Sequence, residues 1–409
     1  MPSRNGDVSR TPSPLTPRTK PTIQSPSVSG EPEGESQGWV LENPRVACVT
    51  TYMSTLGIGI IGCGGITLQN HLPGLALCPD VRVAALCDSD AGTLQRASAA
   101  TGCTVTTTDY HQLLAREDVH AIIIATPNLL HFPIAMAAIA AGKHILCEKP
   151  IAMAAEEART MARAADAAGL RHMTAFTYRF VPAMRYLRHL IDQGDLGEPR
   201  HYRSCRLQDW GTRNLGWRMV KKLAGTGELG DMLSHRINFA HHLIGPMKRM
   251  VAHVKNLTPT RDGKPNDTDD WVGILADFHN GATGVLESSK LASGRNESWR
   301  SLDYVEINGS EASFEFTTGK WNELQFGKLG GPGMAPLSVP REFWVWPGSP
   351  RDPGVGDPLV SFRYDQAVEF IHAIREQRPC SVTFHDGAQT QAVMDAALHS
   401  AATGSWVDL

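Results

Sequence analysis

Three residues from distant parts of the sequence carry side chains suited to proton transfer at an alcohol. Lys149 follows a short apolar run, and Asp231 and His235 stand four residues apart in a stretch with helical character. Residues four apart share one face of a helix, so the carboxylate and the imidazole are expected to point the same way. When hydride leaves carbon, the hydroxyl proton needs a base with a pKa of about 7, and histidine is the usual one.

A lysine ammonium beside the same oxygen would stabilise its alkoxide character, and Asp231 would position the substrate or the imidazole. These residue types therefore predict alcohol oxidation if they share one cleft. Lys149 precedes Pro150, and a peptide before proline adopts the cis form more readily than others. A cis bond at this position would be one way to direct the lysine side chain into a cleft.

Each feature also has a purely structural interpretation. A lysine at a strand end is by default a surface lysine, and an Asp–His pair at this spacing is most often a contact on a helix surface. His241 and His242 downstream fit that surface pattern. No third ligand stands at a useful spacing for a metal, so we predict no metal site. The catalytic interpretation depends on a nucleotide-binding cleft beside Lys149.

A glycine-rich turn after the first apolar run predicts that cleft. Gly62 and Gly64 occupy the first two glycine places of the dinucleotide-binding fingerprint. Glycine is needed there because the backbone bends sharply and lies against a phosphate. Gly65 and Ile66 continue the turn, and Thr67, where a third Gly or Ala is expected, is small enough to keep helix and strand close. The N–H groups at the start of the next helix would bind the pyrophosphate.

The following apolar run, residues 81–87, ends at Asp88. Its offset from the glycines is close to the spacing of about 20 residues at which a carboxylate reaches the adenosine ribose. A carboxylate accepts hydrogen bonds from the ribose hydroxyls and repels a 2′-phosphate, and Ser89 and Asp90 follow it without an Arg or Lys. The sequence therefore predicts NAD rather than NADP, with a helix-capping acid as the structural alternative.

Strand-like and helix-like segments alternate as far as Phe176, which predicts a parallel, doubly wound sheet. Ligands bind at the carboxyl ends of the strands in such a sheet. Two further apolar runs, 121–125 and 144–147, end at polar turns that should lie along the same edge as the glycines. These turns supply further predicted cofactor contacts: Thr126, Pro127, Asn128, Glu148 and Lys149.

Past Phe176, shorter strand-like runs with hairpin signals at Asn280-Gly281 and Asn308-Gly309 predict a large open, mostly antiparallel sheet with helices beside it. Residues 330–358, dense in Gly and Pro, are expected to form a long loop. The expected fold class is α/β. The expected divisions are a disordered leader over 1–54, a dinucleotide-binding Rossmann domain over 55–176 and a substrate-binding and oligomerisation α/β domain over 177–409.

Composition narrows the class of protein. The 409 residues carry a net charge of −3 without a basic cluster, which argues against nucleic acid and anionic membranes as partners. No apolar stretch reaches the roughly 20 residues of a membrane-spanning helix. The eight cysteines form no metal-like pairs, which is typical of reduced thiols in a cytoplasmic protein. The leader lacks a signal-peptide core. Met53, directly before the first strand, could be the natural start, which would make the leader an added extension; a regulatory or targeting tail is the other interpretation.

Several motifs together resemble the Gfo/Idh/MocA family, the glucose–fructose oxidoreductase and inositol dehydrogenase group. The resemblance runs over about residues 56–409 and rests on the glycine turn and four further motifs: Ala125-Thr126-Pro127-Asn128 with His131, Glu148-Lys149-Pro150, Tyr178-Arg179-Phe180 and Asp231-x-x-x-His235. It implies a nicotinamide domain, a second domain whose open sheet forms dimers or tetramers, and sugars or cyclitols as substrates. It further implies that Lys149, Asp231 and His235 are the catalytic trio and that His131 belongs to the cofactor site.

The resemblance is strongest to members acting on cyclic polyols and sugars, including inositol and levoglucosan dehydrogenases, because Trp217-Arg218 precede the glycines of residues 225–230. Two departures are Thr67 in the phosphate turn and Met232-Leu233, where the family usually has an aliphatic and a small residue. Aromatic faces and guanidinium donors suit a polyhydroxylated ring, although each such residue could equally be packing. The predicted substrate contacts are Tyr178, Arg179, Trp210, Trp217 and Arg218.

Three functional hypotheses follow. The leading one is an NAD-dependent dehydrogenase that oxidises a secondary ring hydroxyl of a sugar, glycoside or cyclitol to a ketone, acting as a cytoplasmic homodimer or homotetramer. The second is a family member that uses tightly held NAD for redox-neutral glycoside cleavage or epimerisation. The third is a non-catalytic NAD-binding regulatory protein, against which the presence of Lys149, Asp231 and His235 argues.

Overall fold

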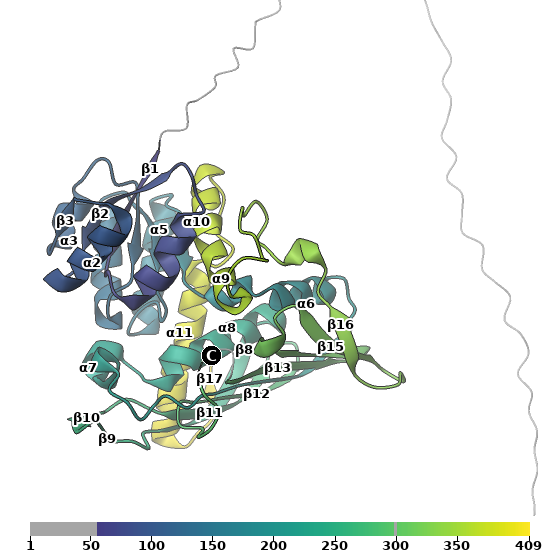
Figure 1. Cartoon of the computed structure of the whole chain (residues 1–409). Coiled ribbons are helices and arrows are strands. Elements are labelled where there is room, and N and C mark those ends of the chain that lie inside the picture. The colour runs from purple at the N-terminus through teal and green to yellow at the C-terminus, as the bar shows by residue number, and fades with distance from the viewer. Residues whose placement is uncertain (1–54, 298–300) are drawn as a thin grey trace, which may run out of the picture. The chain divides into compact units, whose positions relative to one another are not determined.

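The structure is a computed structural model that describes residues 55–297 and 301–409 (Figure 1). The leader predicted over residues 1–54 lies outside the described residues. Within the described ranges, no helix is both long enough and apolar enough to cross a membrane. The described chain builds two large sheets with helices packed on them, which confirms the predicted α/β class.

The first sheet has six parallel strands in the order β3-β2-β1-β4-β5-β6, as the alternating pattern predicted. β4 is buried at every position because helices cover both faces of the sheet. The order reverses between β1 and β4, and ligands bind at such a switch point. The strands are β1 (Leu56–Ile61), β2 (Val81–Cys87), β3 (Thr106–Thr107), β4 (Ala121–Ile124), β5 (His144–Cys147) and β6 (His172–Thr174).

Short 3₁₀ or π turns, labelled η, precede several of the helices that connect these strands. The helical elements are η1 (Thr67–His71), α1 (Leu72–Leu75), α2 (Ala91–Thr101), α3 (Tyr110–Leu114), η2 (Asn128–Leu130), α4 (His131–Ala140) and α5 (Ala155–Ala167). The helix predicted after the glycine turn therefore begins as a π turn, η1, and continues as the single turn α1.

The second sheet has nine strands in the order β16-β15-β14-β13-β7-β12-β11-β8-β17. β7 and β12 pair in parallel and the other neighbours are antiparallel, so the predicted mostly antiparallel sheet is confirmed. A separate hairpin joins β9 to β10. The strands are β7 (Pro199–Leu207), β8 (Met247–Lys255), β9 (Thr260–Arg261), β10 (Lys264–Pro265), β11 (Trp271–Phe278), β12 (Thr283–Ser289), β13 (Leu302–Gly309), β14 (Ala312–Thr317), β15 (Glu323–Lys328), β16 (Ala335–Ser338) and β17 (Val407–Asp408).

The remaining described helical elements follow β6 in the sequence. They are η3 (Thr177–Phe180), α6 (Pro182–Asp192), η4 (Gly216–Met219), α7 (Lys221–Ala224), η5 (Leu229–Leu233), α8 (Ser234–Leu243), η7 (Thr318–Lys320), η8 (Arg341–Phe343), α9 (Pro358–Ser361), η9 (Phe362–Tyr364), α10 (Asp365–Arg375) and α11 (Phe384–Thr403). α11, yellow in Figure 1, contacts α5, the edge strand β6 of the first sheet and β8 of the second sheet.

The loop predicted over residues 330–358 was wrong. These residues are not one loop, because β16 pairs with β15 and brings Leu337 opposite Leu324. Further on, α11 begins at Phe384, where Thr383 and Asp386 form a capping box. The Asp386 carboxylate accepts a hydrogen bond of 2.7 Å from the Thr383 N–H, which satisfies a donor that the helix start would otherwise leave free.

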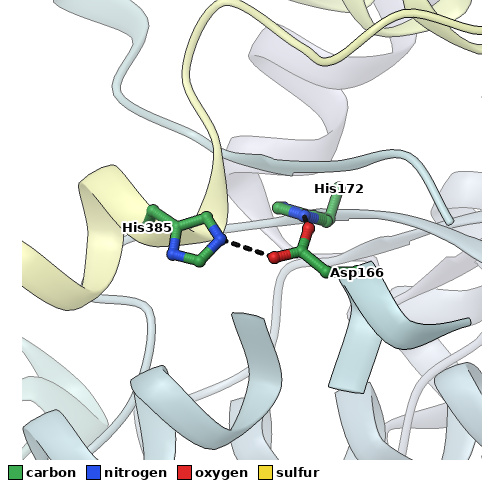
Figure 2. A group of neighbouring side chains, drawn as sticks. All are labelled: Asp166, His172 and His385. Atoms are coloured by element: carbon green, nitrogen blue, oxygen red, sulfur yellow. Dashed lines mark hydrogen bonds and ion pairs between the residues drawn. The ribbon is translucent and has the colours of Figure 1, made fainter. Parts of the chain in front are cut away.

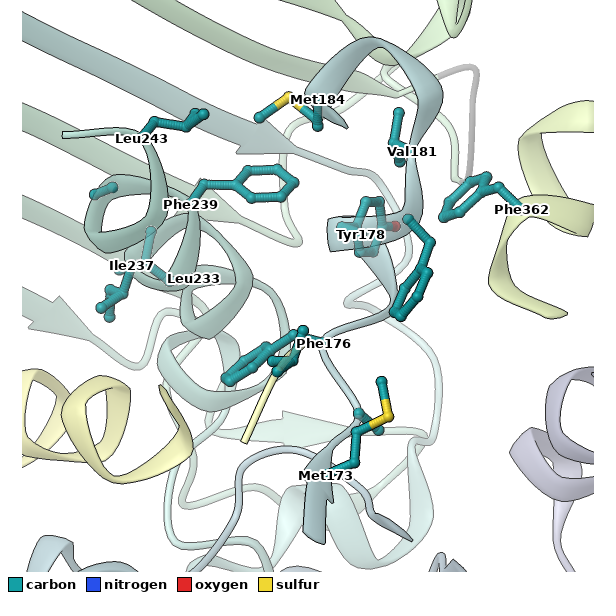
Figure 3. Close-up of a cluster of buried hydrophobic side chains, with 14 of the residues drawn as sticks. Met173, Phe176, Tyr178, Val181, Met184, Leu233, Ile237, Phe239, Leu243 and Phe362 are labelled. Atoms are coloured by element: carbon teal, nitrogen blue, oxygen red, sulfur yellow. The ribbon is translucent and has the colours of Figure 1, made fainter. Parts of the chain in front are cut away.

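An apolar cluster fixes the helix that carries His235. Figure 3 shows Phe176 and Tyr178, from the segment after β6, facing Leu233, Ile237 and Phe239 of η5 and α8. All five side chains are buried. Truncating one large core side chain typically costs about 2–5 kcal/mol, so this packing holds the helix strongly in place.

Candidate active site

The glycine turn closes tightly against the neighbouring strand end. Gly62 has φ +93° and donates a hydrogen bond of 2.8 Å to the Cys87 carbonyl. A Cβ on Gly62 would lie 2.5 Å from the carbonyl carbon and oxygen of Ala125, so the backbone of the next turn excludes any side chain there. The buried Thr67 hydroxyl donates to the Gly62 carbonyl at 2.6 Å. Thr67, a departure from the fingerprint, therefore ties the start of the helix to the turn.

Gly64 faces open space, since a Cβ there would meet no atom within 4 Å. It lies on a cavity of about 410 Å³ at the carboxyl edge of the first sheet. The residues predicted to bind cofactor that line this cavity are Gly64, Gly65, Ile66, Thr126, Asn128, Glu148 and Lys149. The remaining predicted cofactor residues, Gly62, Thr67, Asp88, Pro127 and His131, are not among its lining residues.

Asp88 stands at the end of β2, beside the turn. Its carboxylate accepts one hydrogen bond from the Cys63 N–H at 2.8 Å and another from the Asp90 N–H at 2.9 Å. The side chain is only partly buried. Asp90, not Asp88, caps α2 by accepting from the Thr93 N–H at 2.7 Å. The capping function that we considered for Asp88 thus belongs to its neighbour.

His131 and Asn128 hold the backbone around the cavity. The two ring nitrogens of His131 lie 2.8 Å from the Pro150 carbonyl oxygen and 3.0 Å from that of Thr126. Burial lowers the pKa of this imidazole. The Asn128 amide donates to the Ala224 carbonyl at 2.8 Å, which joins the first sheet's edge to the segment before η5.

Lys149 connects the two halves of the site. Its ammonium donates to the main-chain oxygen of Asp231 at 2.6 Å and to Oδ1 of the same residue at 3.1 Å. The Lys149–Pro150 peptide is cis. The preceding Glu148 is buried with Oε1 2.9 Å from His71 Nε2. Burial alone would raise the pKa of Glu148, but the hydrogen bond from His71 lowers it overall.

Asp231 lines the cavity, whereas His235 lies one turn further along and is 3% exposed. Burial alone would raise the pKa of Asp231, but the charges of Lys149, Arg218 and Lys290 hold it well below its usual range. Burial and then the charge of Lys149 lower the pKa of His235 well below its ordinary value, so its ring is neutral. Its Nδ1 is enclosed and has no hydrogen-bond partner among the described residues.

Two charged residues of the site were missed by sequence reasoning. Lys290, at the end of β12, lines the cavity although it is only 1% exposed, and its Nζ lies 3.5 Å from Oε2 of Glu228. Ser288 donates a hydrogen bond to the other carboxylate oxygen of Glu228. Burial raises the pKa of Glu228 to about 7, although the charge of Lys290 opposes this. The only sequence signal was that Glu228 stands in the glycine-rich segment before Asp231.

Only two of the five predicted substrate contacts line the cavity. These are Trp217 and Arg218, with the guanidinium carbon of Arg218 4.5 Å from the Trp217 ring centre. Trp210 is not a lining residue, but its ring centre is 5.2 Å from Nζ of Lys290, which is one. Tyr178 is buried and packs edge-on against His235, with ring centres 4.7 Å apart. Arg179 points elsewhere and lines a separate cavity, so the structure does not bring it together with Lys149.

One group outside the cavity has the composition of a metal site. Asp166, His172 and His385 place their possible ligand atoms within 4.8 Å of one another (Figure 2). However, the Phe384 N–H donates to Nδ1 of His172 at 3.0 Å, so Nε2 carries the proton that bonds Asp166 at 2.9 Å. A protonated nitrogen cannot bind a metal. We therefore interpret this group as a hydrogen-bonded link between α5, β6 and α11.

Comparisons with known proteins agree with this geometry. The family model described as "Oxidoreductase family, NAD-binding Rossmann fold" matches residues 56–176, and the "GFO/IDH/MocA C-terminal domain" matches residues 184–315. Levoglucosan dehydrogenase of Pseudarthrobacter phenanthrenivorans is 33% identical over 395 residues, which cover 87% of this chain and 99% of that protein. D-glucoside 3-dehydrogenase of Escherichia coli is 27% identical over 267 residues, or 61% and 75% of the two chains.

Comparison with solved structures also finds a levoglucosan dehydrogenase. Levoglucosan dehydrogenase in complex with NADH and levoglucosan superimposes with a TM-score of 0.79 at 33% identity, over 86% of this chain and 99% of that one. The fold and site thus define an NAD-dependent oxidoreductase that acts on CH–OH groups, as predicted. The chain belongs to the Gfo/Idh/MocA family, which confirms the resemblance drawn from its motifs.

Proposed function

We propose that this protein is a sugar dehydrogenase that oxidises a secondary ring hydroxyl of a sugar, glycoside or cyclitol to a ketone. The observation that carries the proposal is the contact of Lys149 with Asp231 inside the cavity that the glycine turn lines. This contact brings an ammonium and a carboxylate from two distant segments to the edge where a nicotinamide cofactor binds. Relatives named for levoglucosan and glucoside oxidation support a sugar substrate.

The residues present fit NAD. Gly64 leaves the approach to the turn free of any side chain, and the N–H groups at the start of the following helix would bind the pyrophosphate. Asp88 carries a partly exposed carboxylate at the end of β2, where the adenosine ribose binds in dinucleotide folds. When bound, NAD accepts the hydride that leaves the substrate carbon.

We assign the other steps to the three residues of the trio. Lys149 donates a hydrogen bond to the reacting oxygen and stabilises its developing negative charge. Asp231, held ionised by three nearby cations, fixes the lysine and accepts a hydrogen bond from the sugar. His235 accepts the hydroxyl proton as the carbon–oxygen double bond forms. Burial and the charge of Lys149 keep its ring neutral, and a neutral imidazole has one nitrogen that can take a proton.

The cavity walls suit a polyhydroxylated ring. Trp217 offers an aromatic face, and Arg218 and Lys290 offer hydrogen-bond donors to hydroxyl oxygens. We propose that Lys290 belongs to the substrate site beside the residues that the sequence predicted. Trp210 and Tyr178 are not among the lining residues, and we propose that they support Lys290 and His235 by packing.

The test is a screen of sugars, glycosides and cyclitols for NADH absorbance, with the purified full chain and added NAD. We expect one or more cyclic sugars to give NADH, at a rate that falls by about 10²- to 10⁴-fold in Lys149→Ala. If substrate is consumed while no NADH accumulates, the redox-neutral hypothesis replaces this proposal. If NAD binds and no compound is converted, the non-catalytic hypothesis does.

We also infer that the chain forms a homo-oligomer through the uncovered face of the second sheet. Trp271 and Leu275 of β11 and Val285 of β12 project from the face opposite the buried side chains, and Leu275 is 50% exposed. An apolar patch of this kind is typical of a protein interface. Light scattering should give a dimer or tetramer, and Leu275→Glu should lower the assembly's mass; a monomeric wild type would contradict the inference.

A further inference from the structure

A second cavity, of about 290 Å³, shares no lining residue with the first. It lies between η3, α6 and α8 on one side and the segments before α9 and α11 on the other. Its walls combine three arginines and a carboxylate with two aromatic rings: Arg179, Arg185, Arg188, Asp192, Phe343 and Trp346. Positive charge therefore exceeds negative charge among the residues that line it.

Only one of the three guanidinium groups is neutralised by a lining carboxylate. Arg188 donates from Nε to Oδ1 of Asp192 at 3.0 Å. Arg185 donates instead to two main-chain carbonyls, those of Phe343 at 2.7 Å and Val345 at 2.6 Å, which carry no net charge. Its guanidinium carbon lies 5.0 Å from the centre of the Trp346 ring, so the aromatic wall holds it in position.

Arg179 is the least satisfied of the three. Its side chain is only 11% exposed, yet its contacts are long: 3.4 Å from Nη1 to the Asn238 amide oxygen and 3.9 Å from Nη2 to the Asp386 carboxylate. Good hydrogen bonds from N–H to oxygen are about 2.7–3.2 Å long. A guanidinium has five donors, and burying them without close acceptors is costly. Burial lowers the pKa of Arg179 to about 10, so it is still charged at neutral pH.

We propose that this cavity binds a small oxyanion, a phosphate or carboxylate group carried by a small molecule, with Arg179 as its principal ligand. A guanidinium fork matches the geometry of both groups, and an anion would supply the close acceptors that Arg179 lacks. The site also adjoins the catalytic region, because Arg179 follows Tyr178, whose ring packs 4.7 Å from His235. This last connection, unlike the binding site itself, rests on the proposed function.

The test is isothermal titration calorimetry on the full chain saturated with NAD, so that the phosphate turn is occupied. Inorganic phosphate and acetate are titrated separately at constant ionic strength. We expect saturable binding of at least one anion, with Arg179→Gln weakening it about 10- to 100-fold, the range of one charge-assisted hydrogen-bonded contact. Lys149→Ala, which changes the other cavity, should keep the wild-type affinity.

Absence of saturable binding for both anions would overturn the proposal, as would wild-type affinity in Arg179→Gln. Binding lost in Lys149→Ala and kept in Arg179→Gln would assign the anion to the catalytic cavity and also overturn it. If Arg179→Gln fails to fold by circular dichroism, Ser381→Glu is the second variant. Ser381 lines the cavity and is exposed, so the added carboxylate should weaken anion binding without disturbing the core.

Discussion

Two alanine substitutions in the glycine turn should affect different properties of the protein. One should lower the stability of the fold, and the other should lower the affinity for the cofactor. Gly62 combines φ +93° with a position where a Cβ would lie 2.5 Å from the Ala125 carbonyl. Gly64, two residues later, has no atom within 4 Å of the position that its Cβ would take. The pair therefore separates the glycine that the fold requires from the glycine that the cofactor requires.

The expected magnitudes follow from these distances. A non-glycine residue held at a strained backbone conformation costs about 1–3 kcal/mol. At Gly62 the 2.5 Å approach adds a steric clash with backbone atoms that cannot rotate away, so Gly62→Ala should lose at least that much free energy of unfolding. Gly64→Ala should change stability by about 0.5 kcal/mol or less. Its Cβ would instead occupy the approach to the pyrophosphate and raise the NAD dissociation constant about 10- to 100-fold.

Urea unfolding of the cofactor-free chain and calorimetric titration with NAD measure the two quantities separately. Gly102→Ala is a useful control, because Gly102 also has positive φ, +70°, but a Cβ added there would meet no atom within 4 Å. Its loss of stability should reflect the backbone conformation alone. Unchanged NAD affinity in Gly64→Ala, or a Gly62→Ala protein as stable as Gly102→Ala, would refute this interpretation of the turn.

Two further predictions concern charged groups around the cleft. Asp88→Asn keeps an acceptor for the Cys63 N–H but removes the charge that repels a 2′-phosphate. The ratio of kcat/KM for NAD to kcat/KM for NADP should therefore fall about tenfold or more. An unchanged ratio would exclude the assignment of Asp88 to the ribose. Because the pKa of Glu228 is raised from 4.5 to about 7, the folded protein holds a proton that the unfolded chain has lost, and stability falls as pH rises between these values. Glu228→Gln should remove this loss of stability, which is on the order of 3 kcal/mol. In urea unfolding, the stability of the variant relative to wild type should therefore rise from pH 5 to about 8. A difference that does not depend on pH would contradict the raised pKa of Glu228.

The first sheet was predictable from the sequence because its strands are short apolar runs that end in polar turns. The glycine turn, Asp88 and the turns after β4 and β5 lie along one edge for that reason. For the second sheet, the sequence predicted the mostly antiparallel pairing but not every strand. β16 is short and carries Pro336, so local composition favoured a loop, and only pairing with β15 makes it a strand.

The site was predictable where one segment supplies several residues and not where distant segments meet. Glu148, Lys149 and Asp231 stand in recognisable motifs, whereas Lys290 joins them because β12 lies beside β11 and its end reaches η5. Arg179 shows that residues adjacent in the sequence need not contribute to the same site. It adjoins Tyr178 in the sequence, yet on the 3₁₀ turn the two side chains diverge, one toward His235 and the other into the second cavity.

The central claim is that Lys149, Asp231 and His235 act on one hydroxyl beside the nicotinamide. It is tested most directly by the rate of NADH formation in Lys149→Ala, with the sugar that responds most strongly in the screen and with NAD binding measured in the same samples. Lys222→Ala, at an exposed position, is the matched control. We predict a fall in turnover of about 10²- to 10⁴-fold with NAD affinity nearly intact and the control unchanged. Wild-type turnover in Lys149→Ala would contradict the claim.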